Sequence, residues 1–325
     1  MPFPFAWRTI RARGRADPVG PQPQTVFVTG ASGLVGSQLC GQLVAAGDRV
    51  LAHSRTPDLQ APMPGVSWLG GDLTGAGDWQ QVLAEADAVV HLAGAPIAAR
   101  RWNPARKREL RDSRILSTRQ IAQALARAPR RPRVFVCASA TGFYGARGDE
   151  PLDESSLPGD DFLARLCVEW EAAAQEARQA GVRVATVRFG AVLSRRGGVL
   201  PRMWPLFRWG LGGPLGPADR YFPWIHEADA AGLVRWILAA ESGLAGALNA
   251  VAPESLQMGD WTRVLAAVAG RPARLPVPGF ALRLALGELG AALVPGQRIA
   301  PRAALAGGYV FSHPELAPAL EDLLA

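Results

Sequence analysis

Short apolar runs alternate with longer amphipathic stretches along the first 250 residues of the chain. The short runs are rich in Val and Ala, which is typical of strands buried on both faces of a sheet. They predict strands at 25–29, 49–53, 66–69, 87–92, 133–139 and 182–188, with a further return to the sheet near 248–251. The amphipathic stretches predict a helix that ends at Gly47 and helices at 79–86, 104–127 and 162–180. This alternation predicts an α/β fold with a doubly wound parallel sheet and right-handed crossovers.

The pattern changes after Gly190, where Gly, Pro and Trp become frequent. We expect 25–250 to form one domain, with 191–225 contributing to a substrate lobe, and 251–325 to form a small, mostly helical C-terminal domain. The apolar stretch at 280–294 has helical spacing and predicts core of that lobe, with a dimer face or a membrane-surface helix as alternatives. Residues 1–24 are basic and Pro-rich without the apolar segment of a secretory signal, which predicts a disordered leader, residues upstream of the true start, or a transit peptide.

The first strand runs into a glycine-rich turn, Thr29-Gly-Ala-Ser-Gly-Leu-Val-Gly36, that opens the first helix. In such a turn Gly30 allows the tight bend, Gly33 the close approach of a phosphate, and Gly36 the packing of helix on strand. Backbone N–H groups and the positive end of the helix dipole then face one point. The residues expected at a dinucleotide are Gly30, Ser32, Gly33, Leu34, Val35 and Gly36. The alternative is a structural turn without a ligand.

The ends of the next strands indicate which dinucleotide binds, because ligands of such folds lie outside the carboxyl ends of the strands. Ser54 and Arg55 follow the second strand, where NAD sites usually carry an acidic residue for the ribose 2′-hydroxyl; an Arg suits the 2′-phosphate of NADP. Asp58, three residues further on, is a weaker candidate for the acidic residue that binds the ribose 2′-hydroxyl in NAD sites. Asp72, after the third strand, is expected either to bind the adenine amino group or to serve as a turn residue. Small residues after the fourth strand would let the ribose and nicotinamide pass; these are Leu92, Ala93 and Gly94. The sequence thus predicts NADP(H) as cofactor.

Composition and charge limit the classes of partner that the protein is expected to bind. Apolar content of 49% and charged content of 19% are typical of a soluble globular chain. The net charge of +7 comes from Arg spread over the whole length, so it predicts no nucleic-acid site, and the absence of a long apolar run predicts no membrane span. Three widely spaced cysteines favour a reducing compartment, and we expect a cytoplasmic protein. The four histidines have no metal-ligand spacing, so no metal site is predicted.

Taken together, these motifs resemble the extended short-chain dehydrogenase/reductases, and within them the epimerase-like subgroup described as NAD-dependent epimerase/dehydratase. The matching segments are the glycine turn, 53–55, 71–73, 91–97, 101–103, 113–115, 138–145, 158–162, 170–172, 187–193, 212–214, 222–226 and 249–253. The stretch 301–324 resembles the small C-terminal domain of that subgroup. The resemblance implies a Rossmann-type fold and NADP(H), and it also implies that Glu109, Arg114 and Val192 lie near the cofactor.

The chain lacks the superfamily's catalytic pair, a Tyr and a Lys four residues apart on one helix. In that pair the Lys cation lowers the phenol pKa so that the Tyr can exchange a proton. Phe162 and Leu166 stand at the corresponding positions, and Lys107 is the only lysine. We expect Ser139 and Tyr144, at the end of the fifth strand, to polarise a substrate carbonyl; the alternative is that both bond to nearby backbone.

Two functions follow from this loss. The first is an oxidoreductase or epimerase with relocated acid–base groups that acts on an unknown small carbonyl or sugar-like substrate. The second is an NADP(H)-binding regulatory protein with little or no turnover that acts through protein partners, for example in cell division. A homodimer through the long helices that flank the fourth and fifth strands is possible by analogy with the superfamily.

Overall fold

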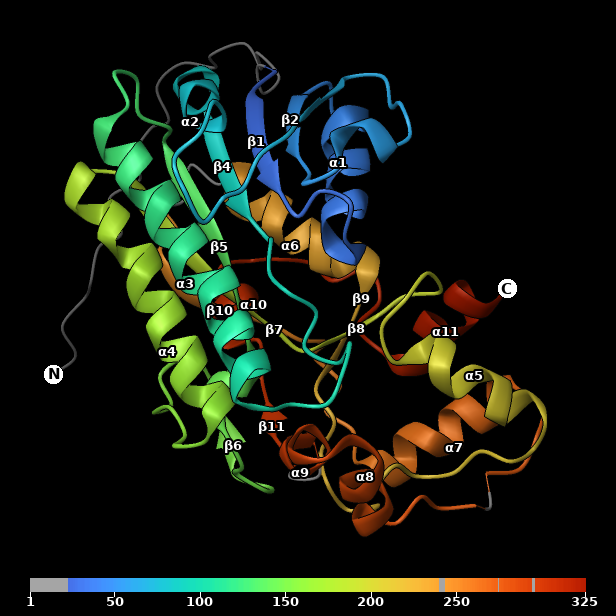
Figure 1. The fold of residues 1–325 in the computed structure, drawn as a ribbon. Helices are drawn as coiled ribbons and strands as arrows, with labels where there is room; N and C mark the ends of the chain where they lie inside the picture. The colour runs from blue at the N-terminus through green and yellow to red at the C-terminus, as the bar shows by residue number, and fades with distance from the viewer. Residues whose placement is uncertain (1–22, 240–242, 274, 294–295) are drawn as a thin grey trace, which may run out of the picture.

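Seven parallel strands form the central sheet of this protein (Figure 1). The computed structural model describes residues 23–239, 243–273, 275–293 and 296–325, so 1–22 of the predicted leader lie outside the described residues. In spatial order the strands are β10 (Gly246–Ala250), β7 (Arg183–Phe189), β5 (Val134–Ala140), β4 (Ala88–His91), β1 (Thr25–Thr29), β2 (Arg49–His53) and β3 (Val66–Leu69). Each predicted strand is present, and the doubly wound parallel sheet is confirmed.

Helices cover both faces of the sheet (Figure 1). On one face lie α1 (Leu34–Ala45), α6 (Glu227–Ala239) and the short α10 (Arg302–Ala306); on the other lie α2 (Trp79–Val82), α3 (Pro104–Arg127) and α4 (Phe162–Gln175). The predicted helices at 79–86 and 162–180 each end in a 3₁₀ turn, at Leu83–Glu85 and Glu176–Ala180. The side chains of Asn103 and Asp161 cap α3 and α4 by accepting backbone N–H bonds at 2.8 Å, which fixes where each helix begins.

The core consists of two apolar layers, one on each face of the sheet. Val26 and Val28 of β1 pack toward α1 and α6, whereas Phe27 between them packs toward α3 and α4. Successive side chains of a strand point to opposite faces, so a strand buried on both sides is mostly apolar. This explains why most residues of these strands are apolar, with polar side chains mainly toward the strand ends.

A smaller, mostly helical lobe packs below the carboxyl end of the sheet (Figure 1). Its core joins residues from α5 (Leu200–Arg208), α7 (Met258–Val268) and α11 (Leu316–Leu324) with the strand pair β8 (Ala191–Leu193) and β9 (Trp224–His226). A second strand pair, β6 (Pro151–Leu152) and β11 (Arg298–Ile299), lies beside it. The lobe therefore contains residues from both before and after residue 250, and the domain boundary at that residue stays a prediction.

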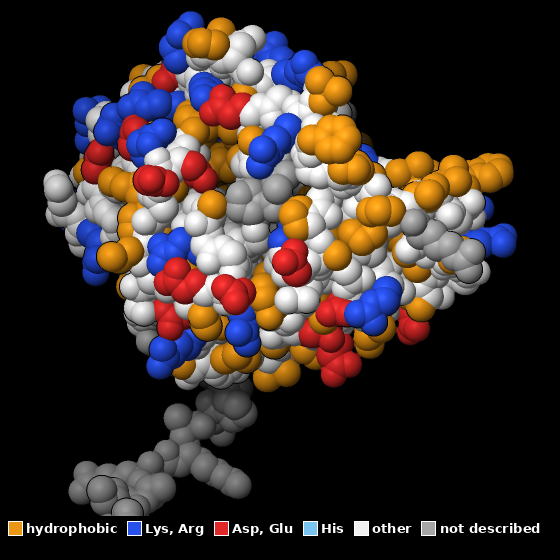
Figure 2. All heavy atoms as spheres, turned by 90° about the horizontal axis from the view of Figure 1, so that it is seen from below, with side chains coloured by type: hydrophobic (Ala, Val, Ile, Leu, Met, Phe, Trp, Pro, Cys, Tyr) orange, Lys and Arg blue, Asp and Glu red, His pale blue; other side chains and the backbone are white. Residues whose placement is uncertain are grey.

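The apolar stretch at 280–294 is predicted to be core of the lobe, but two of its large side chains are exposed. It forms two helices, α8 (Gly279–Leu286) and α9 (Glu288–Leu293), separated at Gly287, whose φ of 63° breaks the helix. Leu289 is buried, but Phe280 and Leu284 are 73% and 75% exposed. Figure 2 shows hydrophobic side chains gathered over this lobe on the face seen from below. The helical spacing is correct, but spacing cannot show whether a neighbouring element covers the apolar face. In the described residues, no helix has the length and apolar character that crossing a bilayer requires.

Glycine lets α1 pack directly on the turn that precedes it. A Cβ on Gly36 would lie 2.2 Å from the carbonyl oxygen of Gly30 and 2.8 Å from the Cα of Ala31. Both neighbours are backbone atoms, which cannot move away without displacing β1. Gly41, five residues further along the same helix, has open space at the corresponding point.

We therefore expect opposite results from two identical substitutions in α1. Gly36→Ala should lower the free energy of unfolding by about 3 kcal/mol or more, because the added methyl group overpacks against backbone. Gly41→Ala should leave it unchanged or raise it by up to about 1 kcal/mol, since Ala is the better helix former. Urea unfolding followed by circular dichroism measures both, and equal stability of the two variants would contradict this packing.

Candidate functional site

The glycine turn places the N-terminus of α1 at the point where the strand order reverses. Gly30 has a φ of 68°, and a Cβ there would lie 2.7 Å from the carbonyl carbon of Leu92 and 2.8 Å from the nitrogen of Ala93. The turn is therefore pressed against the chain that leaves β4. Only a glycine satisfies both the left-handed backbone and this close contact.

The amino end of α1 is open to a ligand. Gly33 is the N-cap residue, no side chain caps the helix, and the first turn holds no acidic residue. Ser32 and Gly33 are exposed, and Leu34 and Val35 are half-buried. Because the first N–H groups of a helix have no partner within it, this end carries unpaired donors and a partial positive charge. These features fit a pyrophosphate.

Arg55 follows β2, and its charge acts on the nearby Asp72 carboxylate. Within the described part of the chain its guanidinium makes no hydrogen bond or ion pair, and the residue is exposed. Ser54 beside it is buried, and its hydroxyl accepts the N–H of Thr56 at 3.2 Å. A free, planar cation at this strand end fits a 2′-phosphate better than a ribose hydroxyl.

Asp72 is a turn residue in this structure. One of its carboxylate oxygens accepts both the N–H of Thr74, at 2.9 Å, and the Thr74 hydroxyl, at 2.8 Å. These bonds lower the pKa of the carboxyl group. The second carboxylate oxygen is left for another partner, so a contact with the adenine amino group stays a prediction.

Buried polar side chains behind the site fix the loop after β4. The Arg114 guanidinium donates to the carbonyls of Leu110 and Ala95, both at 3.0 Å, and lies against Gly94, where a Cβ would come within 3.1 Å of it. Burial lowers the pKa of Arg114 to about 10. Arg114 therefore supports the segment along which the nicotinamide end is expected, rather than facing the open side itself.

Glu109 and Val192, which the resemblance brought in, lie in different surroundings. Glu109 is exposed on α3, where the Arg106 and Arg100 side chains bond it and hold its pKa low. Val192 lies in β8, and its carbonyl oxygen is 3.1 Å from where a Cβ of Gly198 would be. Direct contact of either residue with a cofactor stays a prediction.

Arg196 is a candidate that the sequence did not suggest. Its guanidinium donates to the Ser37 hydroxyl at 2.8 Å and to the Glu227 carboxylate at 2.6 Å, so the side chain crosses the first turn of α1. Because the Glu227 carboxylate balances its charge, Arg196 ties the start of α6 to the first turn of α1. Arg196 follows β8, which lies outside the main sheet, and for that reason the strand-end rule did not reach it.

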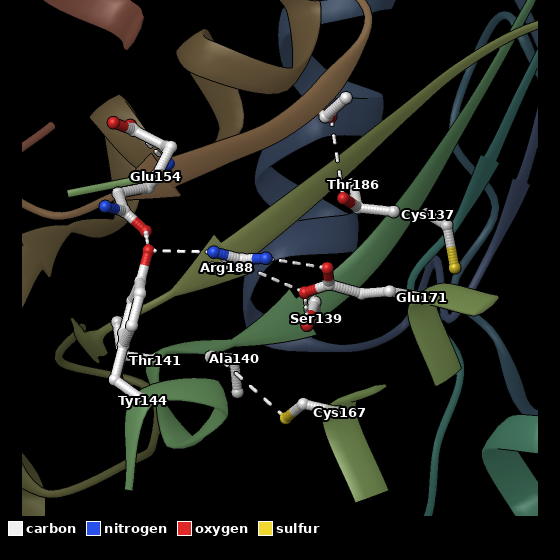
Figure 3. Close-up of polar contacts among 12 residues, drawn as sticks. Cys137, Ser139, Ala140, Thr141, Tyr144, Glu154, Cys167, Glu171, Thr186 and Arg188 are labelled. Atoms are coloured by element: carbon white, nitrogen blue, oxygen red, sulfur yellow. Dashed lines mark hydrogen bonds and ion pairs between the residues drawn. The ribbon is translucent and has the colours of Figure 1, made fainter. Parts of the chain in front are cut away.

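A buried charged network lies at the carboxyl ends of β5, β7 and β10 (Figure 3). Ser139, Arg188 and Asn249 stand side by side in the registers of β5, β7 and β10. The Arg188 guanidinium pairs with both oxygens of Glu171, from α4, at 2.8 and 2.9 Å. The Ser139 hydroxyl donates to the same carboxylate at 2.7 Å. The side chains of Arg188 and Glu171 are only 5% and 13% exposed, so this pair is largely withdrawn from water.

Tyr144 closes the other end of this network (Figure 3). It is fully buried; its hydroxyl donates to the Asn249 side chain at 2.7 Å and accepts from Arg188 at 2.9 Å. Burial raises the pKa of Tyr144. The hydroxyl protons of Ser139 and Tyr144 are therefore both directed at partners inside the protein. Their catalytic role stays a prediction, and it requires at least one of these bonds to be exchanged for a substrate.

A cation from another helix lies beside Phe162, the residue that stands where the superfamily carries its catalytic Tyr. Lys107 of α3 lies with its ammonium 5.0 Å from the centre of the Phe162 ring. Leu166 and Trp170, which follow Phe162 on α4, are buried in the sheet-facing core. The apolar stripe predicted on α4 is thus core, except at Phe162, which is half-buried.

Two histidines and a carboxylate meet in the lobe although they are far apart in sequence. The rings of His226 and His313 stack with centroids 3.8 Å apart, and Nε2 of His226 lies 3.2 Å from Asp322. Ligand atoms of the three residues fall within 4.8 Å of one another. However, Nδ1 of His226 accepts the N–H of Ala228 at 3.1 Å, which places the ring proton on Nε2. A protonated nitrogen cannot ligate a metal, so the group fits a contact between histidine and carboxylate better than a metal site.

The fold and the glycine turn define a Rossmann-type α/β protein with the architecture of a dinucleotide site. The sequence matches the NAD dependent epimerase/dehydratase family over residues 26–250, and a domain of unknown function, DUF1731, over residues 277–323. The chain belongs to the NAD dependent epimerase/dehydratase family. The resemblance to extended short-chain dehydrogenase/reductases is thereby confirmed.

Similar proteins occur in animals, plants and bacteria. The epimerase family protein SDR39U1 of Bos taurus is 38% identical over 305 residues, which is 92% of this chain and 99% of that protein. The chloroplastic SDR39U1 homolog of Arabidopsis thaliana is 37% identical over 92% of this chain and 86% of its own length. Human SDR39U1, solved with NADPH, superimposes with a TM-score of 0.80 at 35% identity, covering 92% of this chain and 98% of that one.

Breaking the buried ion pair should destabilise the protein strongly. Arg188→Met leaves the Glu171 carboxylate without its cation, and we expect a loss of about 3–5 kcal/mol in the free energy of unfolding. The double variant Arg188→Met/Glu171→Gln should lose less than the sum of the two single variants, because neither charge is then left alone. Urea unfolding of the four proteins gives the coupling energy. A coupling near zero would mean that the pair is solvated and does not act as a unit.

His91, at the end of β4, should make stability depend on pH. It is fully buried between the Thr29 hydroxyl at 2.6 Å and the Ser117 hydroxyl at 3.1 Å, and burial lowers its pKa from 6.5 to about 3. Between these values the unfolded chain binds a proton that the native protein does not, so stability falls on acidification below pH 6.5.

The window from pH 6.5 to 5 is the informative one, since most carboxylates stay ionised there. One such histidine contributes at most about 1.4 kcal/mol per pH unit to the slope of the unfolding free energy. We expect His91→Gln to show a smaller slope than the wild-type chain in urea unfolding. Identical slopes would contradict a neutral, buried His91.

Proposed function

We propose that this chain binds NADP(H) and catalyses hydride transfer or epimerisation on a small carbonyl or sugar-like substrate. The observation that carries the proposal is the open amino end of α1 combined with a free Arg55 at the end of β2. The helix end supplies donors for the pyrophosphate, and Arg55 supplies a cation for the 2′-phosphate. The presence of NADPH in the structure of the human relative supports the choice of cofactor.

Bound NADP(H) would supply the hydride, and the residues of this chain would position it. The loop 92–94, supported by Arg114, would pass beside the ribose and nicotinamide. Ser139 is the penultimate residue of β5, and its hydroxyl, which now donates to Glu171, would exchange this partner for the substrate. A solved structure from Corynebacterium glutamicum described as a nucleoside-diphosphate sugar epimerase supports a sugar-like substrate. It is 35% identical with a TM-score of 0.74, over 93% of this chain and 58% of that one.

The alternative is an NADP(H)-binding regulatory protein with little turnover. The observation that favours it is the internal use of both predicted catalytic hydroxyls, with Tyr144 fully buried. In that case NADP(H) would alter the surface that the small lobe presents to a protein partner. Turnover in the presence of a competent substrate separates the two functions.

Cytoplasmic location and a homodimer through α3 and α4 are part of the same proposal. The three thiols are free and buried, which is compatible with a reducing compartment. On the outer surface of α3 and α4, Leu116 and Val168 are each 39% exposed. Analytical ultracentrifugation of the wild-type chain and of Leu116→Glu tests the dimer, and a wild-type monomer would exclude it.

Arg55 should decide between the two dinucleotides. Arg55→Ala should weaken NADPH binding about 10- to 100-fold, because charge-assisted hydrogen bonds contribute about 1.5–3 kcal/mol, and should leave NADH binding unchanged. Arg49→Ala is the matched control, because Arg49 is an exposed Arg at the other end of the same strand. Isothermal calorimetry measures both ligands. If Arg55→Ala and Arg49→Ala bind NADPH alike, Arg55 does not bind the 2′-phosphate.

Replacement of Ser139 should show which of the two functions, enzyme or regulatory protein, the chain performs. Ser139→Ala should bind NADPH as tightly as the wild-type chain and lower kcat by about 100-fold, in the range typical of general acid–base groups. The readout is NADPH oxidation with a panel of small carbonyl compounds, with Thr186→Val, on the neighbouring strand, as the control for a lost hydroxyl. Unchanged kcat in Ser139→Ala would remove Ser139 from the reaction.

A further inference from the structure

Lys107 is the one lysine of the chain, and it lies at the place where relatives of the wider superfamily carry a catalytic tyrosine. Its ammonium is 5.0 Å from the centre of the Phe162 ring. The two residues come from different helices, α3 and α4, whose amino ends lie side by side above α9 (Figure 1). The fold thus places a cation beside Phe162, although α4 itself carries neither the hydroxyl nor the lysine of the catalytic pair.

The surroundings of Lys107 connect it to the expected cofactor site. Trp102 packs edge-on against Phe162, with ring centroids 5.2 Å apart. Trp102 belongs to a small apolar cluster with Leu110 and Leu289, against which Ala95 also packs. Ala95 directly follows Gly94 on the loop expected to hold the nicotinamide end. Lys107 therefore stands beyond that end, where a substrate would sit.

The charge around Lys107 is strongly positive. From Arg100 to Arg114 the sequence holds seven cationic residues and two carboxylates. The carboxylate of Glu109 is shared by Arg100 and Arg106, and Arg111 pairs with Glu169 of α4. Such an excess of one sign along a short segment attracts ligands of opposite charge.

The partner of Lys107 comes from the other lobe. Its ammonium is paired with the carboxylate of Glu288, at the start of α9. The two side chains are 30% and 48% exposed, and an ion pair open to solvent contributes little to stability. Another carboxylate or a phosphate can therefore replace Glu288 at small cost.

We propose that Lys107 binds the anionic group of the substrate, a carboxylate or phosphate, at the mouth of the cofactor site, in the place that the Glu288 carboxylate holds in this structure. The inference rests on the proposed function, because it names the class of substrate for that site. Since Glu288 belongs to the small lobe, replacing it also couples substrate binding to the contact between the lobes.

A chain with a single lysine allows a direct chemical test. An aldehyde condenses with the Lys107 amine and releases water, and cyanoborohydride then donates hydride to the imine to give a stable secondary amine. The probe is the neutral aldehyde methyl 4-formylbenzoate, and the competing anions are benzoate and inorganic phosphate, with neutral benzamide as the control. The N-terminal amine of the same sample is the internal reference, and mass spectrometry of peptides separates the two sites.

We expect benzoate and phosphate to slow the labelling of Lys107 severalfold, relative to the N-terminal amine, because a bound anion covers the Lys107 amine. Benzamide, which carries no charge, should have no such effect. Glu288→Gln should lower the phosphate concentration needed for this protection, because it removes the competing anion. Glu85→Gln, which removes an exposed carboxylate beside Arg49, should change nothing. Equal labelling with and without the anions, or no effect of Glu288→Gln, would overturn the proposal.

Calorimetry with NADPH distinguishes a failure of this proposal from a failure of the proposed function. Lys107→Met should bind NADPH like the wild-type chain. A wild-type chain that binds NADPH but whose Lys107 is not protected by anions overturns the anion site alone. A chain whose Lys107 is protected by anions but that binds no NADPH overturns the proposed function, and with it the substrate role of Lys107.

Discussion

The contact on which the site depends is the one between the glycine turn and the two pieces of backbone beside it. Gly30 touches the chain that leaves β4, and Gly36 touches Gly30 itself, at distances that exclude any side chain. These contacts place the open end of α1 at the point of the sheet where the strand order reverses. The loop at 92–94, the buried Arg114 behind it and the His91 hydrogen bonds below it are all arranged around this approach.

The buried pair of Arg188 and Glu171 holds the polar ends of β5, β7 and β10 together. Its two charges face each other, and they hold Ser139 and Tyr144 in the same network. An ion pair with two good hydrogen bonds tolerates burial, while either charge alone would not. The polar side chains at this strand end are therefore directed at one another, while Lys107 lies beside Phe162 and pairs with Glu288 of the small lobe.

The sequence alone could predict those features that depend on neighbours in the chain. The apolar runs predicted each strand of the main sheet, and helical spacing predicted the two long helices from Pro104 and Phe162, whose starts Asn103 and Asp161 cap in the structure. The glycine spacing predicted the turn, and the place of Arg55 after the second strand predicted a positive charge at that strand end. Alternation, capping and turn formation act over a few residues, so the sequence contains their full cause.

Only the tertiary structure decided which distant side chains meet and which apolar faces stay open. Lys107 and Phe162, Arg188 and Glu171, and His226 and His313 come together because crossover helices and the returning C-terminal segment pack beside one another, and no local pattern encodes those distances. For the same reason Phe280 and Leu284 read as core but lie exposed. Periodicity sets which side chains share a face, whereas burial depends on whether another part of the chain covers that face.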